Sequence, residues 1–209
     1  HRLRILGLTV RVYEAGGGVG GTWYWNRYPG ARCDVDSMQY SYSFSEELEQ
    51  EWEWSEKYSP QPEILKYANH VADKFNLHDN IYLSTRVERA VFDENKNRWF
   101  IHTDRGDRVS SQFCVMAVGC LSAANIPQFE KLECFNGDIY HTGEWPHGGV
   151  DFTGKNVGVI GTGSSAIQSI PIIAQQAKLL KVFQRTPNYA VPAWNSKMDP
   201  GYEKEVKTN

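Results

Sequence analysis

This sequence of 209 residues lacks several features, and each absence argues against a class of protein. No apolar run approaches the roughly 20 residues that a membrane-spanning helix needs, and no charged and then apolar leader opens the chain. Neither sign of charge dominates, because 22 Lys and Arg face 25 Asp and Glu for a formal net charge of −3. We therefore expect a cytoplasmic protein that binds neither a membrane nor nucleic acid.

Cysteine is also scarce, and its spacing argues against disulfide and metal chemistry. The four cysteines are Cys33, Cys114, Cys120 and Cys134, and no two of them form a CxxC pair. None has metal-ligand spacing to any of the six histidines. We predict reduced, structural thiols and no metal site.

The composition is typical of a folded protein, because 41% of the residues are hydrophobic and 22% are charged. The chain is long enough for one large domain or two small ones.

The first 21 residues have the pattern of the second half of a dinucleotide-binding βαβ unit. Residues 1–7 indicate the end of a helix closed by a glycine, and residues 8–13 indicate a strand that ends at Glu14, before the cluster Gly16–Gly21. An acid at this position bonds ribose hydroxyls in FAD or NAD, although an acid that ends a strand can also be a solvated loop residue. We expect the first strand and its phosphate-binding turn upstream of His1.

Residues 22–60 are irregular and rich in aromatic side chains, which either anchor a loop to the core or form a wall against a flat ring system. Residues 62–75 have the apolar spacing of a helix. Residues 81–116 predict short strands in an antiparallel meander, with turns at 93–97 and 104–107. The apolar run 113–119 predicts a buried strand that returns to the main sheet.

A second nucleotide pattern begins at a strand over 157–160. The glycine turn that follows, Gly161-x-Gly163-x-x-Ala166, opens a predicted helix over 164–177 with a kink at Pro171, and 180–183 predicts the next strand. Arg185 comes just after that strand, where an arginine suits the 2′-phosphate of NADP. The alternative for Arg185 is a surface ion pair.

Two further sites remain open on residue chemistry alone. His141 is either a hydrogen-bonded loop histidine or a functional one. Arg32 and Asp34 could form a salt bridge on a turn, or could meet a cofactor.

Residues 135–146 match the longer pattern F-x-G-x-x-x-H-T-x-x-W-P at every specified position. This is the fingerprint of type I Baeyer–Villiger monooxygenases, and the sequence resembles the phenylacetone and cyclohexanone monooxygenase group of that family. The segments 17–34, 161–167 and 184–187 resemble the family as well, so the likeness covers nearly the whole chain.

The resemblance implies an α/β fold with two dinucleotide-binding, Rossmann-like domains, both incomplete. Residues 1–121 would form the FAD-binding domain, with the antiparallel meander inserted in it. Residues 122–209 would form a linker with the fingerprint, followed by the NADP-binding domain. The family's first GxGxxG is expected before His1 and its catalytic arginine after Asn209, so the chain is expected to be an internal fragment.

The resemblance also implies site residues. Glu14 would hold the FAD ribose, Val87 would contact the adenine through its backbone, and the flavin would meet Thr22, Trp23, Tyr24, Trp25, Asp34 and Tyr40. The nicotinamide half of NADP would lie near Arg32, Cys33 and Asp34, its 2′-phosphate at Arg185 and Thr186, and its pyrophosphate at Gly161, Thr162, Gly163, Ser164, Ser165, Ala166 and Ile167. Asp34 would hold the missing arginine in position, and His141 would couple domain movement to cofactor placement without acting as a general base.

The implied activity is the FAD- and NADPH-dependent insertion of one oxygen of O2 next to a ketone carbonyl, through a flavin C4a-peroxide, to give an ester or lactone. One alternative is a flavin-containing monooxygenase that oxygenates nitrogen or sulfur, a group with a shorter fingerprint. A flavoprotein reductase that acts on thiols would need the cysteine pair that this sequence lacks. The last alternative is a truncated dinucleotide-binding module without turnover.

Overall fold

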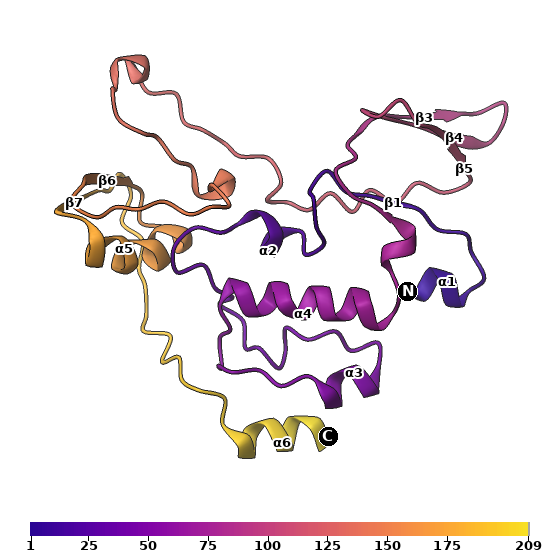
Figure 1. Cartoon of the computed structure of the whole chain (residues 1–209), viewed down its shortest axis with the longest axis horizontal. Coiled ribbons are helices and arrows are strands. Elements are labelled where there is room, and N and C mark those ends of the chain that lie inside the picture. The colour runs from indigo at the N-terminus through magenta and orange to yellow at the C-terminus, as the bar shows by residue number, and fades with distance from the viewer. Residues whose placement is uncertain (209) are drawn as a thin grey trace. The chain divides into compact units, whose positions relative to one another are not determined.

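The computed structural model describes residues 1–208 (Figure 1). They divide into two compact units. The first unit combines residues 1–24 with 68–122, and the second combines residues 25–67 with the chain from Ala123 onward. Each unit is therefore built from two separate stretches of sequence. The division into cofactor domains at residues 121 and 122 concerns ligands and stays a prediction.

The first unit begins with the short helix α1 (Arg2–Ile5), which Gly7 follows at a φ of 77°. Strand β1 (Val12–Tyr13) pairs in parallel with β2 (Ile81–Tyr82), and this ladder contains only two residue pairs. The strand predicted over 8–13 is thus present only at its end, where β2 supplies a partner.

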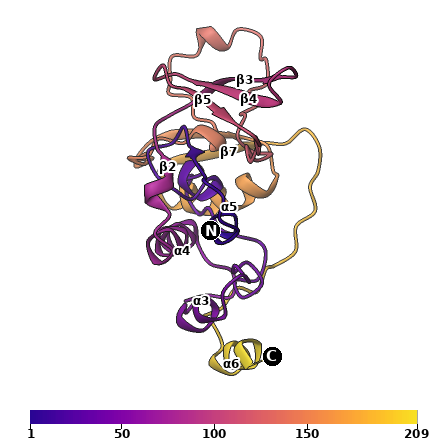
Figure 2. The same ribbon diagram turned by 90° about the vertical axis from the view of Figure 1, so that its right-hand side faces the viewer.

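A separate three-stranded antiparallel sheet completes the first unit (Figure 2). Its order is β3 (Val87–Asp93), β4 (Arg98–Thr103) and β5 (Arg108–Ser111). The β3–β4 turn is stabilised by the Asp93 carboxylate, which accepts hydrogen bonds from the Asn95 and Lys96 amides at 3.0 and 3.1 Å. Both turns fall where the sequence predicted them.

The prediction of a buried strand over residues 113–119 is wrong. The structure gives this segment no strand, and the side chains of Phe113, Val115 and Val118 are 67, 77 and 72% exposed. A strand inside a parallel sheet needs ladder partners, and nothing within residues 1–208 pairs with this segment. An apolar run indicates burial only when neighbouring strands exist to receive it.

Helix α4 (Gln61–Lys74) lies close to the helix predicted over 62–75. Its buried hydrophobic residues are Ile64, Tyr67, Val71 and Ala72, which share one face at helical spacing. The division between the two units falls within this helix, after Tyr67.

The second unit contains a strand–helix–strand motif with β6 (Asn156–Ile160), α5 (Ser164–Gln176) and β7 (Leu179–Phe183). The two strands are parallel and in register from Asn156↔Leu179 to Ile160↔Phe183. Helix α5 runs through Pro171 as one element. Trp145, Phe152 and Ile173 form the buried core of this motif.

The remaining helices are short. They are α2 (Thr22–Trp25), α3 (Glu46–Glu51), α6 (Pro200–Thr208) and the 3-10 turns η1 (His78–Asn80), η2 (Leu132–Cys134) and η3 (Thr142–Glu144). Within the second unit α3 and α6 lie side by side in both views (Figures 1 and 2), and Lys207 Nζ donates to the carbonyls of Gln50 and Trp52 at 3.1 and 2.8 Å. None of the helices in residues 1–208 combines the length and apolar character needed to cross a bilayer.

Candidate functional site

The clearest ligand-binding geometry lies at the carboxyl ends of β6 and β7 in the second unit. The chain leaves β6 at Gly161, whose φ of 106° is a conformation that favours glycine, and the Gly161 amide donates to the Phe183 carbonyl at 2.8 Å. A Cβ added at Gly161 or Gly163 would meet no atom of residues 1–208 within 4 Å, apart from its chain neighbours. The turn therefore leaves open space directly above its backbone.

Helix α5 begins in this turn, and within residues 1–208 no side chain caps its first amides. Gly163 occupies the N-cap position and provides no side-chain acceptor, and the first turn contains no acidic residue. The first N–H groups of a helix have no intrahelical acceptor, and the helix dipole makes this end positive. Such an end fits a pyrophosphate.

Arg185 and Thr186 follow β7 at the same edge, because Ile160 and Phe183 are paired residues of parallel strands. Both side chains are exposed, and Arg185 forms no ion pair with any residue in the described part of the chain. Asn188 links this segment to the glycine turn by donating from Nδ2 to Thr162 Oγ1 at 3.1 Å. The surface ion pair considered for Arg185 is thus absent from residues 1–208, and its guanidinium is available to an anion.

The segment Arg32–Asp34 packs in the same unit. Arg32 Nη1 donates to Glu56 Oε2 at 3.1 Å and to the Tyr58 carbonyl at 3.3 Å, so its ion pair is with Glu56 and not with Asp34. Cys33 is buried, and its burial raises the pKa of the thiol. Asp34 is exposed, and its carboxylate accepts no hydrogen bond within residues 1–208.

The glycine cluster of the first unit is used differently, because side chains of the unit itself occupy it. Glu14 follows β1, and its Oε1 accepts from the Gly16 amide at 2.6 Å. The hydroxyl of Tyr24 accepts from the Gly17 amide at 3.0 Å. The Tyr24 ring lies so close to the backbone that a Cβ on Gly18 would approach it to 2.8 Å.

The other residues predicted to contact FAD are distributed over both units. Thr22 and Trp23 lie in helix α2 of the first unit, and Val87 is the exposed first residue of β3. Trp25 and Tyr40 lie in the second unit, each 40% exposed. The Trp25 ring lies 6.0 Å from the ring of His147, whose pKa is lowered by burial and by Arg27.

The 135–146 fingerprint has a structural explanation for most of its fixed positions. The ring of Phe135 covers Gly137 so closely that a Cβ there would approach it to 2.7 Å. His141 caps η3 by accepting from the Gly143 amide at 3.1 Å through Nδ1, which is the role of a hydrogen-bonded loop histidine. Trp145 is 7% exposed and anchors the segment in the core beside Phe152.

Sequence reasoning missed Gln168, a half-buried residue of α5. Its Oε1 accepts from the hydroxyl of Tyr28 at 2.8 Å and from the Arg32 amide at 3.3 Å, and its Nε2 donates to the Arg32 carbonyl at 3.0 Å. The two segments are 136 residues apart in sequence, so no local pattern could have indicated the contact.

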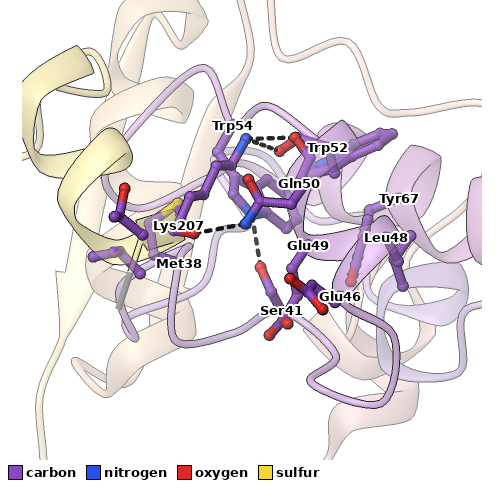
Figure 3. Close-up of a pocket in the computed structure, with 12 residues that line it drawn as sticks. Met38, Ser41, Glu46, Leu48, Glu49, Gln50, Trp52, Trp54, Tyr67 and Lys207 are labelled. Atoms are coloured by element: carbon purple, nitrogen blue, oxygen red, sulfur yellow. Dashed lines mark hydrogen bonds between the residues drawn. The ribbon is translucent and has the colours of Figure 1, made fainter.

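A cavity of about 470 Å³ lies between α3 and α6, and its lining includes none of the predicted site residues, although Tyr40 directly precedes the lining residue Ser41 (Figure 3). Its walls include Trp54, whose Nε1 donates to Ser41 Oγ at 2.9 Å, and Tyr67, whose pKa is raised by burial. Gln50 Nε2 donates across it to the Lys207 carbonyl at 2.6 Å (Figure 3). The aromatic residues of 22–60 thus act partly as anchors, since Trp52, Trp54 and Tyr67 contact one another.

The sequence of this chain is similar to those of known flavin-dependent monooxygenases. Residues 44–206 match the sequence profile of a family described as flavin-binding monooxygenase-like. Acetone monooxygenase (methyl acetate-forming) from Gordonia sp. (strain TY-5) is 48% identical over 200 residues, which are 96% of this chain and 38% of that protein. Phenazine N-monooxygenase PhzNO1 from Lysobacter antibioticus is 44% identical over 210 residues, 100% of this chain and 39% of that protein.

A solved structure gives the same result. The structure of oxidized steroid monooxygenase bound to NADP superposes with a TM-score of 0.94 at 64% identity, covering 100% of this chain and 40% of that one. The chain therefore spans about two fifths of the length of the proteins it matches.

Proposed function

The chain belongs to the flavin-binding monooxygenase-like family, and from this membership we propose that it forms the cofactor-binding middle of an FAD- and NADPH-dependent Baeyer–Villiger monooxygenase. In this proposal residues 1–121 serve FAD and residues 122–209 carry the linker with the fingerprint and the NADP site. The substrates are a ketone and O2, and the product is an ester or lactone.

The observation that carries the proposal is the open turn at Gly161. This open space lies at one edge of the β6–β7 pair, together with the uncapped start of α5 and with Arg185, which forms no ion pair within residues 1–208. Together they provide backbone N–H donors for a pyrophosphate and a guanidinium for a 2′-phosphate. This set of donors fits NADP better than NAD, because NAD has no group that pairs with Arg185.

FAD fits the first unit through Glu14. One carboxylate oxygen, Oε1, already accepts from the Gly16 amide, whereas Oε2 makes no hydrogen bond within residues 1–208. A ribose hydroxyl can donate to that second oxygen. The bound flavin would supply the reaction with O2, and NADPH would supply the electrons.

The residues of this chain would bind and orient the two cofactors and would exclude water from them. Arg32 and Cys33 would lie by the nicotinamide half of NADP, and Asp34, whose carboxylate has no partner in the described chain, would be available to hold an arginine beside the reacting atoms. His141 would serve cofactor placement through η3, because its Nδ1 is already committed to the Gly143 amide.

A second candidate function is oxygenation of a ring nitrogen. It is favoured by the 44% identity to a phenazine N-monooxygenase, which is close to the 48% identity to acetone monooxygenase. The two candidates share both cofactors and differ in the atom attacked. Incubating the protein that carries this sequence with NADPH, O2 and either a small ketone or a phenazine separates them: an ester supports the first candidate and an N-oxide alone supports the second.

The cofactor proposal is tested by titrating the protein with NADP⁺ and NAD⁺. Arg185→Ala should weaken NADP⁺ about 10- to 100-fold, the effect of losing a charge-assisted pair, and should leave NAD⁺ unchanged. Lys178→Ala is the matched control, because it removes the same charge just before β7 instead of after it. Equal affinity of the unaltered protein for both nucleotides would contradict the role of Arg185.

Flavin binding is tested separately by absorbance. The purified protein, after addition of FAD and removal of the excess, should retain a flavin spectrum. A colourless protein would favour the alternative of a dinucleotide-binding module without turnover.

A further inference from the structure

Gln168 connects the predicted pyrophosphate site to the segment predicted to lie at the nicotinamide. It is the fifth residue of α5, about 6 Å along the helix axis from Ser164. Its side chain bonds both the N–H and the C=O of Arg32, as a neighbouring strand would. The amide is oriented by this arrangement, since Oε1 receives two donors while Nε2 faces a carbonyl.

The backbone beneath this contact is adapted to a close approach. Gly30 has a φ of 77°, and a Cβ on it would lie 2.3 Å from the Gln168 carbonyl oxygen and 3.2 Å from Ile172 Cγ1. Only glycine allows α5 and the turn at residues 28–32 to touch at this point. The contact is thus built by both partners, with glycine on one side and a bidentate amide on the other.

The side chain of Arg32 is fixed from a different direction. Glu56 Oε2 holds its Nη1 at 3.1 Å, and the same carboxylate oxygen also accepts from Asn195 Nδ2. Gln168 therefore bonds both polar groups of the Arg32 backbone, and Glu56 holds its guanidinium. Residues 59–61 pair with the neighbours of Arg32, because the Cys33 amide donates to the Ser59 carbonyl and the Gln61 amide donates to the Ala31 carbonyl. Removing Gln168 would leave the guanidinium paired with Glu56, while the N–H and C=O of Arg32 would lose their side-chain partners.

We propose that Gln168 is a positioning residue that holds Arg32, and with it the nicotinamide half of NADP, in register with the helix that binds the pyrophosphate. This inference rests on the proposed function, since it requires NADP to bind at Gly161. The adenosine end of the nucleotide would bind without Gln168, whereas the nicotinamide end would depend on it.

The test compares two probes, NADP⁺ and adenosine 2′,5′-bisphosphate, which lacks the nicotinamide half. Gln168→Leu should weaken NADP⁺ about tenfold and leave the bisphosphate unchanged, because two hydrogen bonds to Arg32 are lost far from the 2′-phosphate. Tyr28→Phe removes only the bond from the Tyr28 hydroxyl to Gln168 and should have a smaller effect. Gln175→Leu is the matched control, an exposed glutamine of the same helix.

Hydrogen exchange provides a readout without nucleotide. The Arg32 amide should exchange about tenfold faster in Gln168→Leu than in Gln175→Leu, since Gln168 Oε1 is its acceptor. Equal loss of affinity for both probes would mean that the variant only disturbs α5, which contradicts the inference. Unchanged NADP⁺ affinity would overturn the inference and leave the proposed function standing. If the unaltered protein binds neither probe, the proposed function fails and the inference with it.

Discussion

Two glycine-rich turns follow strands in this chain, Gly16–Gly21 after β1 in the first unit and Gly161–Gly163 after β6 in the second. In the first, the Glu14 carboxylate and the Tyr24 hydroxyl accept hydrogen bonds from glycine amides, and the Tyr24 ring packs against the glycine backbone. In the second, no described residue other than the chain neighbours has an atom within 4 Å of the place where a side chain would start on Gly161 or Gly163. Gly16, Gly17 and Gly18 of the first turn therefore serve close packing, whereas Gly161 and Gly163 of the second turn leave open space.

The difference shows what a glycine pattern can indicate. A glycine removes a Cβ, and either the protein or a ligand can use the freed space. Neighbouring side chains decide whether the protein or a ligand uses this space. In the first turn Tyr24 packs against the glycines, whereas the second turn begins a helix whose first turn contains no acidic residue. The open turn is for this reason the better evidence for a bound phosphate.

The largest effect should come from a glycine that packing requires. Gly30→Ala should destabilise the protein by about 3 kcal/mol, because it adds both strain at positive φ and overlap with α5. Gly149 has the same φ of 77° but open space, so Gly149→Ala should cost about 1 kcal/mol from the backbone alone. Urea unfolding measures both, and equal costs would show that α5 does not contact Gly30 in solution.

The next test adds a methyl group to each of the two turns. In the first turn we expect a loss of stability, and in the second a loss of NADP⁺ affinity. Gly16→Ala should lower the free energy of unfolding by about 1 to 2 kcal/mol, since its Cβ would lie 2.9 Å from the Tyr24 ring. Gly163→Ala should change stability by less than about 0.5 kcal/mol, because its φ of −76° suits alanine and the space is empty. The added methyl should instead weaken NADP⁺ about tenfold. A Gly163→Ala protein with normal NADP⁺ affinity would refute the phosphate site.

Sequence alone predicted the parts of this structure that depend on local pattern. Helix α4, the β3–β5 meander turns and the β6–α5–β7 motif all lie close to their predicted bounds. The family resemblance drawn from the fingerprint is confirmed by the family match and by the relatives. The error at 113–119 and the missed Gln168 both concern partners distant in sequence, which periodicity and motif spacing do not contain.

The two acidic residues predicted to serve FAD allow a third test. Glu14→Ala should reduce stability by about 1 kcal/mol, because the Gly16 amide loses its acceptor. Asp34→Ala should leave stability nearly unchanged, since its carboxylate makes no hydrogen bond or ion pair within residues 1–208, but should slow ketone oxygenation about tenfold. Ester formation in a protein that carries this sequence is the measurement, and an unchanged rate would remove Asp34 from the reaction.

The smallest effect concerns the burial of Cys33 beside the predicted nicotinamide segment. Burial raises the pKa of this thiol, so its alkylation rate should still be rising with pH where that of a free cysteine thiol levels off. At any one pH Cys33 should also react more slowly than Cys134, which is exposed, and peptide mass spectrometry distinguishes the two sites. Because only the thiolate reacts, the comparison reports both access and ionisation at Cys33. Fast reaction at Cys33 would show that residues 32–34 open in solution. The second unit would then be less closely packed at Cys33 than the structure indicates.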